Sequence, residues 1–337
     1  MNHGKSVNKN TSFIQKLAFP ACVIIILFGV YAFPSSELSD RSAGKSSFAF
    51  ADDMSAQLVN VQSGSMSEIH ELSRVYRLNF NEDPCPVPNP GLFDGNNYED
   101  ETIKVAYSQE VIFDSIVHFA EVTIAHPSQI RTAWAGRSVG TSAVFSPLLI
   151  AEDINAVVAI NGDFAGYRKE GIIIRQGQEV RYNPCGWSAL LIDIDGNFHI
   201  VPDKEAQAVM DEYNIVNSFA FGPSLVVKGE IEYNLDKSAG DDPPMLNRSL
   251  HPRTAIGQLG ELRYLLCCVE GRRKETRGVN IEQLAKIMYD KSCAQAYTLD
   301  GGQSTSLIIN NNLVNIPLWG GNRKLSEILF FATAIPN

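Results

Sequence analysis

Three segments of this chain carry acidic, basic, amide or hydroxyl side chains next to an apolar run. They are Asn161-Gly162-Asp163, Arg253-Thr254 and Asp300-Gly301-Gly302-Gln303-Ser304-Thr305. Glycine lets the backbone approach a ligand closely and expose N–H groups to an anion. A pair of carboxylates is the usual equipment for glycoside hydrolysis, and a guanidinium suits a phosphate. Each segment taken singly predicts only a turn, because Asn-Gly and Asp-Gly pairs are above all turn formers.

Short apolar runs must position these side chains. Residues 156–160 predict a buried strand that ends at Asn161, and residues 296–299 predict another that ends at Asp300. Residues 111–125 predict one or two further strands. Four hairpins are expected, at 171–182, 188–201, 225–233 and 306–315. The second of these turns at Asp-Gly, which is a strong hairpin signal.

Helical patterns are few. The clearest helix follows Asn280, which can cap it, with Gln283 at the capping-box position. Shorter helices are expected at 147–154 and within 54–78. Because strands dominate, we expect an α+β fold with a mixed, largely antiparallel β-sheet core and few helices.

The N-terminal region predicts a membrane anchor. Residues 17–33 are uncharged and follow three lysines. As a helix this run would span roughly 26 Å, close to the thickness of a bilayer core. We expect a cytoplasmic tail at 1–16, one transmembrane signal-anchor helix at 17–33, a stalk or linker at 34–101 and an extracytoplasmic domain at 102–337. A cleaved signal peptide is the alternative.

Charge and composition exclude one class of partner. The formal net charge is −10, although the first 33 residues contain three lysines and no acid. A domain this acidic is a poor match for nucleic acid, whose backbone rewards clustered Lys and Arg. No Cys/His cluster has metal-ligand spacing, so neither a metal nor a cofactor is expected.

The six cysteines do not form a regular framework. Cys22 lies in the apolar run, which leaves an odd number, so full pairing is precluded. One bridge, for instance between Cys85 and Cys185, stays open. Cys267 and Cys268 are adjacent in a predicted strand and point to opposite faces, so we expect at most one to face the core.

Taken together and in order, these segments resemble the phosphodiester glycosidase family. The family pattern has an Asn-Gly-x-Phe turn, a Gly-Pro-x-Leu-Val stretch, Arg-Thr-Ala-Ile-Gly, a glycine before a helix, and Leu-Asp-Gly-Gly-x-Ser-Thr. This chain matches at 161–164, 221–226, 253–257, Gly278 and 299–305, and Arg323 resembles the closing arginine of the family. The resemblance covers about residues 102 to 335. Gln303 and Thr298 depart from a glycine and an asparagine that are common in the family.

The resemblance implies a hydrolase that cleaves a sugar-1-phosphodiester, such as an N-acetylglucosamine-1-phosphodiester, at the anomeric carbon. The predicted anchor places this activity at the cell envelope. Asp163 and Asp300 would be catalytic, one as general base and one as stabiliser of the oxocarbenium-like centre, in an order the sequence leaves open. The implied substrate contacts are Asn161, Gly162, Arg253, Thr254, Gly301, Gly302, Gln303, Ser304, Thr305 and Arg323. Arg253, Thr254 and the glycine amides would stabilise the departing phosphate.

Two other functions remain open from the sequence. The chain could be a non-catalytic protein that binds an exopolysaccharide or wall polymer, in which the Gln303 departure marks lost turnover. It could also be a wall-polymer transferase or processing factor. In each case the partner is a sugar-phosphodiester or envelope glycan, with the membrane reached through the N-terminal helix.

Overall fold

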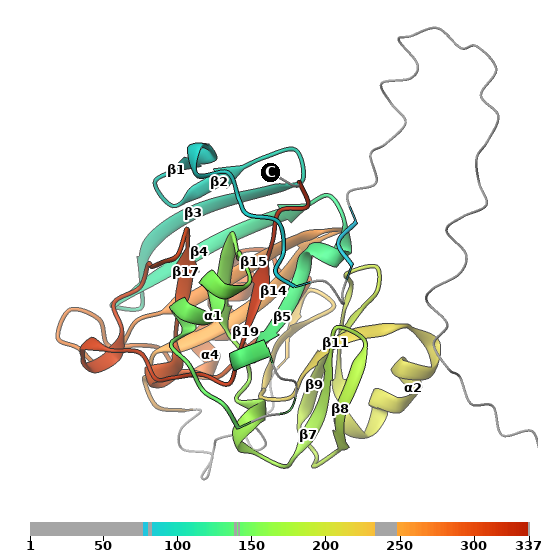
Figure 1. Ribbon diagram of the computed structural model, residues 1–337. Helices are drawn as coiled ribbons and strands as arrows, with labels where there is room; N and C mark the ends of the chain where they lie inside the picture. Colours follow the sequence, from blue (N-terminus) through green and yellow to red (C-terminus); the bar gives the residue numbers. More distant parts are fainter. Residues whose placement is uncertain (1–76, 80–82, 138–139, 141, 233–247, 336–337) are drawn as a thin grey trace, which may run out of the picture. The chain divides into compact units, whose positions relative to one another are not determined.

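The computed structural model of this protein describes residues 77–79, 83–137, 140, 142–232 and 248–335 (Figure 1). The expected cytoplasmic tail, membrane anchor and most of the stalk, with its short helix, lie outside the described residues. Within the described part of the chain, no helix is long and apolar enough to cross a membrane.

The strands are arranged in two large sheets. The larger has nine strands in the order β1-β2-β3-β4-β15-β14-β16-β12-β13. Their bounds are β1 (Phe93–Asp94), β2 (Asn97–Glu99), β3 (Ile103–Ile112), β4 (Ser115–Ile124), β15 (Arg263–Val269), β14 (Arg253–Gly260), β16 (Gln295–Leu299), β12 (Ser224–Val227) and β13 (Glu230–Ile231). The second sheet has the order β18-β17-β6-β19-β5. It consists of β18 (Asn312–Leu313), β17 (Leu307–Ile309), β6 (Val158–Asn161), β19 (Glu327–Phe331) and β5 (Ile130–Trp134).

Two smaller sheets complete the strands. One has the order β10-β9-β11 and the other pairs β7 with β8. Their bounds are β10 (Phe198–Pro202), β9 (Ser188–Asp193), β11 (Ile215–Phe219), β7 (Gly171–Arg175) and β8 (Gln178–Asn183). Every strand pairing within the described residues is antiparallel. The four predicted hairpins are confirmed, as is the antiparallel α+β character of the fold.

Three α-helices are described. They are α1 (Pro147–Asp153), α2 (Ala206–Glu212) and α4 (Ile281–Asp290). The capping box predicted for α4 is present, because Asn280 accepts from the Gln283 amide and Gln283 accepts from the Asn280 amide. The sequence did not predict α2, whose two turns are too short to show a clear apolar stripe. Short 3-10 turns occur at Pro90–Leu92, Pro127–Gln129, Ala135–Arg137, Ala165–Tyr167, Asp203–Glu205, Gly302–Ser304 and Leu318–Gly320.

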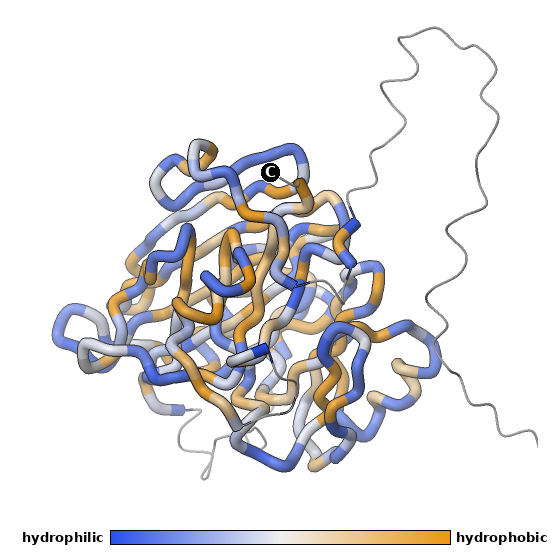
Figure 2. Tube along the Cα trace, in the orientation of Figure 1, coloured by the Kyte–Doolittle hydropathy of each residue, from blue (hydrophilic) through white to orange (hydrophobic). Residues whose placement is uncertain are grey.

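The two large sheets pack against each other, and a helix covers the outer face of each. Leu266 of β15 and Leu329 of β19 share one buried cluster between the sheets. Leu284 of α4 packs on the outer face of the nine-stranded sheet, and Ile150 of α1 packs on that of the five-stranded sheet. Figure 2 shows hydrophobic residues concentrated along the central strands and hydrophilic residues in the connecting loops. The result is a layered α+β domain with three apolar interfaces.

This layering corrects the expectation for Cys267 and Cys268. Both side chains are fully buried, Cys268 between the sheets and Cys267 beneath α4. Because α4 covers the outer face, both faces of β15 are buried, which a strand seen alone cannot reveal. The five cysteines of the described residues are free thiols, Cys85 and Cys185 among them.

The sheet also begins earlier than expected. β1 and β2 precede residue 102, at which we placed the start of the domain, and β2 pairs with β3. Tyr98 of β2 is buried in the cluster between the sheets. The segment before residue 102 therefore adds an edge to the nine-stranded sheet.

Gly278, which leads into α4, lies where two chain segments nearly touch. Its φ is +89°, and a Cβ added here would lie 2.5 Å from the carbonyl carbon and oxygen of His251. His251 and Val279 form a β-bridge beside it, so the contact cannot open without breaking that bridge. Only glycine fits both the backbone conformation and the space.

We predict that Gly278→Ala destabilises the domain far more than Gly229→Ala. Gly229 has a similar φ of +80°, but a Cβ there would meet none of the described atoms within 4 Å. The control should lose about 1–2 kcal/mol of unfolding free energy from backbone strain alone. Gly278→Ala should lose a further ~1–3 kcal/mol from the steric clash. Urea denaturation measures both, and equal losses would show that the close approach to His251 is unimportant.

Candidate active site

The three chemistry-bearing segments meet at one end of the two large sheets. β14 and β16 are neighbours, and their register pairs Thr254 with Leu299, which places the start of one strand beside the Asp300 turn. β6 belongs to the other sheet and ends at Asn161. The Asp300 amide donates to the Gly162 carbonyl at 3.2 Å and joins the two turns directly. Tertiary structure thus brings together residues that are far apart in the sequence.

The buried carboxamide of Asn161 holds this junction. Its Oδ1 accepts from the Thr254 hydroxyl at 2.8 Å and from the Ser306 amide at 3.2 Å. Its Nδ2 donates to the Asp300 carbonyl at 2.6 Å and to the Gly162 carbonyl at 3.1 Å. A carboxamide has two donor hydrogens and two acceptor lone pairs, and all four are used here. Asn161 therefore positions the turns and has no side-chain group left for a ligand, and the Thr254 hydroxyl is likewise engaged.

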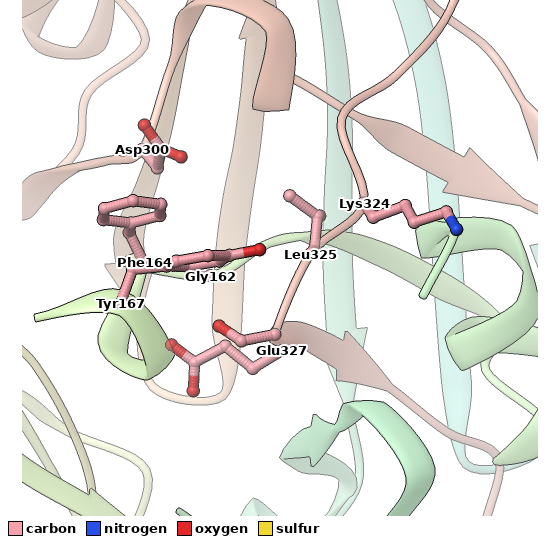
Figure 3. Close-up of a pocket in the computed structure, with 8 residues that line it drawn as sticks. Gly162, Phe164, Tyr167, Asp300, Lys324, Leu325 and Glu327 are labelled. Atoms are coloured by element: carbon pink, nitrogen blue, oxygen red, sulfur yellow. The ribbon is translucent and has the colours of Figure 1, made fainter. Parts of the chain in front are cut away.

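Asp300 lines a small pocket between the two turns (Figure 3). The pocket is lined by Gly162, Phe164, Tyr167, Asp300, Lys324, Leu325, Ser326 and Glu327. Asp300 Oδ1 accepts from the Gly301 amide at 2.8 Å, whereas Oδ2 is buried without a hydrogen-bond partner among the described residues. Burial raises the pKa of Asp300, against the opposing effects of the nearby Ser304 hydroxyl, of the Gly301 amide and of the charges on Arg323 and Arg168. A carboxyl with a raised pKa and an available oxygen is suited to proton transfer.

Two aromatic rings form a wall of the pocket. Phe164 and Tyr167 stack with their ring centroids 4.6 Å apart and 13° between the planes. Figure 3 shows the Phe164 ring beside Asp300 and the Tyr167 ring pointing across the pocket toward Leu325. Phe164 has a φ of +68°, a conformation that costs roughly 1–2 kcal/mol for a bulky residue. Such strain is typically retained where a side chain must take a particular position in a site.

Polar atoms without partners gather around the same turn. Among the described residues, buried atoms that lack a hydrogen-bond partner include Arg168 Nε and Nη1, His251 Nε2, Asp300 Oδ2, Ser304 Oγ, Thr305 Oγ1 and Asn322 Oδ1. Most buried polar groups in proteins are hydrogen-bonded, and each one left unsatisfied costs free energy. A cluster of them at one place indicates that a polar ligand or water binds there. Ser304 and Thr305, predicted as substrate contacts, are thus available for that role.

Asp163 differs sharply from Asp300, because it is fully buried in an ion-pair network. Its Oδ1 accepts from Arg175 Nη2 at 2.9 Å. Its Oδ2 accepts from Arg168 Nη2 at 2.9 Å and from the Ala220 amide at 2.7 Å. Arg175 also binds Glu327, through Nε at 2.8 Å and Nη2 at 2.9 Å. Both carboxylate oxygens of Asp163 are therefore engaged, and neither is presented to the pocket.

The pKa values of the two buried carboxyls that share Arg175 are shifted in opposite directions. Burial alone would raise the pKa of Asp163, but Arg168 and Arg175 hold it well below its usual range. Burial raises the pKa of Glu327 to about 7, opposed by Arg175 and reinforced by the charge of Asp163. One guanidinium between two carboxylates makes it costly to ionise both. Asp163 is the charged member of the pair, and Glu327 retains a proton up to near-neutral pH.

The donors predicted to bind phosphate are largely used within the protein. Arg253 is buried, and it donates to the carbonyls of Val279 and Ser249, each at 3.2 Å. The Gly301 amide binds Asp300 Oδ1, and the Gly302 amide donates to the Pro252 carbonyl at 2.9 Å. These hydrogen bonds hold the loop around Asp300.

Gln303 and Arg323 connect the Asp300 turn to a neighbouring loop. Gln303 Nε2 donates to the Gly321 carbonyl at 3.3 Å, and the Gln303 carbonyl accepts from the Arg323 amide at 3.1 Å. A glycine at position 303 could not make the first of these bonds. The departure from the family pattern therefore adds one hydrogen bond between the two loops. The Arg323 side chain is exposed, and its charge acts on Asp300.

Several residues of the site were not predicted, among them Tyr167, Arg168, Arg175 and Glu327. Arg175 ends the apolar run 171–174, and Glu327 begins the apolar run 328–332. A lone charge beside an apolar strand is the signal that could have found them, because such a charge is buried only when paired. Arg168 and Tyr167 lie in a polar loop and give no such signal. No group of His, Cys, Asp or Glu suited to hold a metal occurs among the described residues.

Arg272 links His251 to the Asp300 turn. Arg272 Nε donates to His251 Nδ1 at 2.9 Å, and the Arg272 guanidinium is the nearest side chain to the position of a Cβ on Gly302. Burial, together with the charges of Arg253 and Arg272, lowers the pKa of His251 to about 4. With Nδ1 accepting a hydrogen bond, the neutral ring carries its proton on Nε2.

We predict that His251 makes the domain less stable as the pH falls. The unfolded histidine takes up a proton near pH 6.5, whereas the folded one resists it until about pH 4. Unfolding free energy should therefore drop between pH 6.5 and 4 more steeply in the wild type than in His251→Gln. Chemical denaturation across this range measures both slopes, and identical slopes would refute the depressed pKa.

We also predict that Arg175→Met costs about 3–5 kcal/mol of unfolding free energy, because it leaves two buried carboxyls without their shared cation. The matched control is Arg263→Met, which breaks an exposed pair with Glu121 at 2.7 Å. The control should cost less than about 1 kcal/mol. Denaturation at pH 7.5 compares the two, and similar losses would show that the buried network contributes no more than a surface pair.

Comparison with known proteins agrees with this geometry. The family model for phosphodiester glycosidases matches residues 154–332, which include all of the site segments described above. Over 185 residues the chain is 27% identical to the SPbeta prophage-derived uncharacterized protein YomE of Bacillus subtilis. The aligned region covers 52% of this chain and 28% of that protein. Over 84 residues it is 29% identical to the N-acetylglucosamine-1-phosphodiester alpha-N-acetylglucosaminidase of Bos taurus, covering 23% and 16%. The matches thus span less than a third of either relative.

Two solved structures share the fold. The zebrafish N-acetylglucosamine-1-phosphodiester alpha-N-acetylglucosaminidase catalytic domain, auto-inhibited by its pro-peptide, superposes with a TM-score of 0.57 at 21% identity, covering 75% of this chain and 88% of that chain. A hypothetical protein from Synechocystis gives a TM-score of 0.56 at 14% identity, covering 68% and 62%. Since the family model covers more than half of the sequence and its ordered motifs build one site, this chain belongs to the phosphodiester glycosidase family.

Proposed function

We propose that this domain hydrolyses a sugar-1-phosphodiester at the anomeric carbon and releases a free sugar and a phosphomonoester. The observation that carries the proposal is Asp300, a pocket-lining carboxyl with a raised pKa and one buried, unpartnered oxygen. Membership of the phosphodiester glycosidase family gives the class of bond, and the name of the bovine relative suggests N-acetylglucosamine as the sugar.

Asp300 is the proposed general base. Water attacks the anomeric carbon, the bond from that carbon to the phosphate oxygen breaks with its electron pair going to the phosphate, and Asp300 accepts the proton of the water. A phosphate is a good leaving group, so strong general-acid assistance is unnecessary. Its raised pKa makes Asp300 a stronger base than an exposed aspartate.

Other groups of the pocket are proposed to orient the sugar. The Ser304 and Thr305 hydroxyls lack partners among the described residues and can bind sugar hydroxyls. The half-exposed ring of Tyr167, stacked on Phe164, offers an apolar face to the C–H side of a pyranose. Asn161 and Thr254 hold the turns in place, and Asp163 serves the buried ion-pair network in this proposal.

The proposed setting is the cell envelope. The predicted signal-anchor at 17–33 would hold the domain on the outer side of the membrane, where sugar phosphodiesters of envelope glycans occur. This part of the proposal depends on the sequence alone.

We predict that Asp300→Asn lowers kcat/KM for release of N-acetylglucosamine from UDP-N-acetylglucosamine by at least ~100-fold, because the general base is lost. Asp195→Asn is the matched control, since Asp195 also precedes a glycine in a turn and is exposed. The control should keep wild-type activity, and activity retained in Asp300→Asn would remove Asp300 from the mechanism.

The wild-type protein separates the competing functions in the same assay. Release of free sugar supports a hydrolase. If calorimetry shows binding of an envelope polymer and no sugar is released, the protein is a binding protein and not a hydrolase. Transfer of sugar to an acceptor glycan without free sugar would indicate a transferase.

A further inference from the structure

Arg168 is a buried arginine that the mechanism above does not use. It directly follows the 3-10 turn Ala165–Tyr167, and its side chain is only 7% exposed. Nη2 donates to Asp163 Oδ2 at 2.9 Å, and the guanidinium lies over the Trp187 ring, 5.4 Å from its centroid. An ion pair on one side and a cation–π contact on the other hold the group in one orientation.

Most donors of Arg168 are unused. Nε and Nη1 are buried, and neither has an acceptor among the described residues. Nη2 carries two hydrogens, and Asp163 is the acceptor recorded for it. Since Nη2 shares one edge of the guanidinium with Nε and another with Nη1, one complete two-donor edge is left. This edge has the spacing that binds two oxygens of a carboxylate or phosphate.

Arg175 provides an internal comparison, because it binds the same aspartate. Its Nε and Nη2 reach Glu327 and Asp163, and its Nη1 donates to the carbonyls of Ile174 and Ser218. All three nitrogens of Arg175 thus have acceptors inside the protein, as expected for a structural arginine. The difference between the two guanidinium groups therefore points to an acceptor for Arg168 that comes from outside the chain.

The charges of the buried network also favour an external anion as the acceptor for Arg168. Asp163 is ionised and neighbours two arginines, whereas burial raises the pKa of Glu327 to about 7. Near neutral pH Glu327 is partly protonated, so the four groups together carry net positive charge. A buried excess of positive charge is costly unless an anion neutralises it.

Arg168 directly follows a lining residue of the proposed reaction centre, although it does not itself line the pocket. The charge of Arg168 lowers the pKa of Asp300, which places the two groups within electrostatic range. Tyr167, the preceding residue, lines the pocket together with Asp300. A sugar phosphate that extends from Asp300 past Tyr167 would carry its phosphate toward Arg168.

We propose that Arg168 binds the phosphate of the substrate through its free guanidinium edge, and that Asp163 and Trp187 are positioning residues that aim it. The choice of a phosphodiester rests on the proposed function, whereas anion binding by Arg168 does not. In this arrangement Arg168 makes the site specific for a glycosyl phosphate over an uncharged glycoside. Asp163 then contributes to activity without touching substrate.

The test compares Arg168→Met and Arg168→Lys in the full chain with the surface control Arg263→Met. Two substrates are used, UDP-N-acetylglucosamine and the uncharged p-nitrophenyl N-acetylglucosaminide. Arg168→Met should lower kcat/KM for the phosphodiester by ~10–100-fold and leave that for the uncharged glycoside within about threefold, as expected for loss of a charge-assisted hydrogen bond. Arg168→Lys should fall between, because it keeps the charge and loses the two-donor edge. Arg263→Met should match the wild type with both substrates.

Binding of inorganic phosphate, measured by calorimetry, provides a readout independent of turnover. Wild-type protein should bind phosphate at least ~10-fold more tightly than Arg168→Met, with Arg168→Lys again between. If the wild type hydrolyses neither substrate, the proposed function fails and this titration alone decides the role of Arg168. If it hydrolyses only the phosphodiester, the titration replaces the missing comparison.

Two outcomes would overturn the proposal. Equal losses on both substrates in a folded Arg168 variant would show that Arg168 acts only through the structure around Asp163. Equal phosphate affinity in the wild type and Arg168→Lys would show that its guanidinium does not bind the anion. Circular dichroism confirms folding, and if Arg168→Met does not fold, the comparison of wild type with Arg168→Lys still decides.

Discussion

The carboxamide of Asn161 joins the two large sheets at the site. It lies at the end of β6 in the five-stranded sheet, and it binds Thr254 and the Asp300 carbonyl, which belong to the nine-stranded sheet and its following turn. It also binds the Ser306 amide, which leads into β17. Because all of its donors and acceptors are satisfied in a buried place, a change in any one segment would leave a polar group unpaired. Together with the bond from the Asp300 amide to the Gly162 carbonyl, this side chain holds Asp300 in position.

The site combines polar groups whose hydrogen bonds are all made within the protein with polar groups that lack a partner. Asn161, Arg175 and Asp163 have every side-chain donor or acceptor group engaged within the protein. Asp300 Oδ2 and the free donors of Arg168 lie beside them without partners among the described residues. The fully hydrogen-bonded groups make the site rigid. The groups without partners are therefore held in place before a ligand binds. This division explains why Asp163, a carboxylate predicted from its motif, has both oxygens engaged, whereas Asp300 keeps one oxygen without a partner among the described residues.

Local patterns predicted most of the elements, because each depends on few neighbouring residues. The Asp195-Gly196 turn and the Asn280 capping box act within a few residues, and the structure contains both. The short helix α2 was missed because two turns do not establish a periodicity. The burial of both Cys267 and Cys268 was missed because it depends on α4, a separate element that covers the outer face of the sheet.

The sequence by itself determined the family and the strand-rich fold, because ordered motifs and turn chemistry are written in consecutive residues. Only the tertiary structure decided which polar groups are free. Glu327 reaches Asp163 through Arg175, from elements more than 150 residues apart in the chain. Arg253, a strong phosphate candidate by its motif, donates to backbone carbonyls, whereas Arg168, in a loop without a motif, keeps open donors. Whether a donor is available depends on which acceptors the fold brings within hydrogen-bond distance, and no local pattern of residues contains that information.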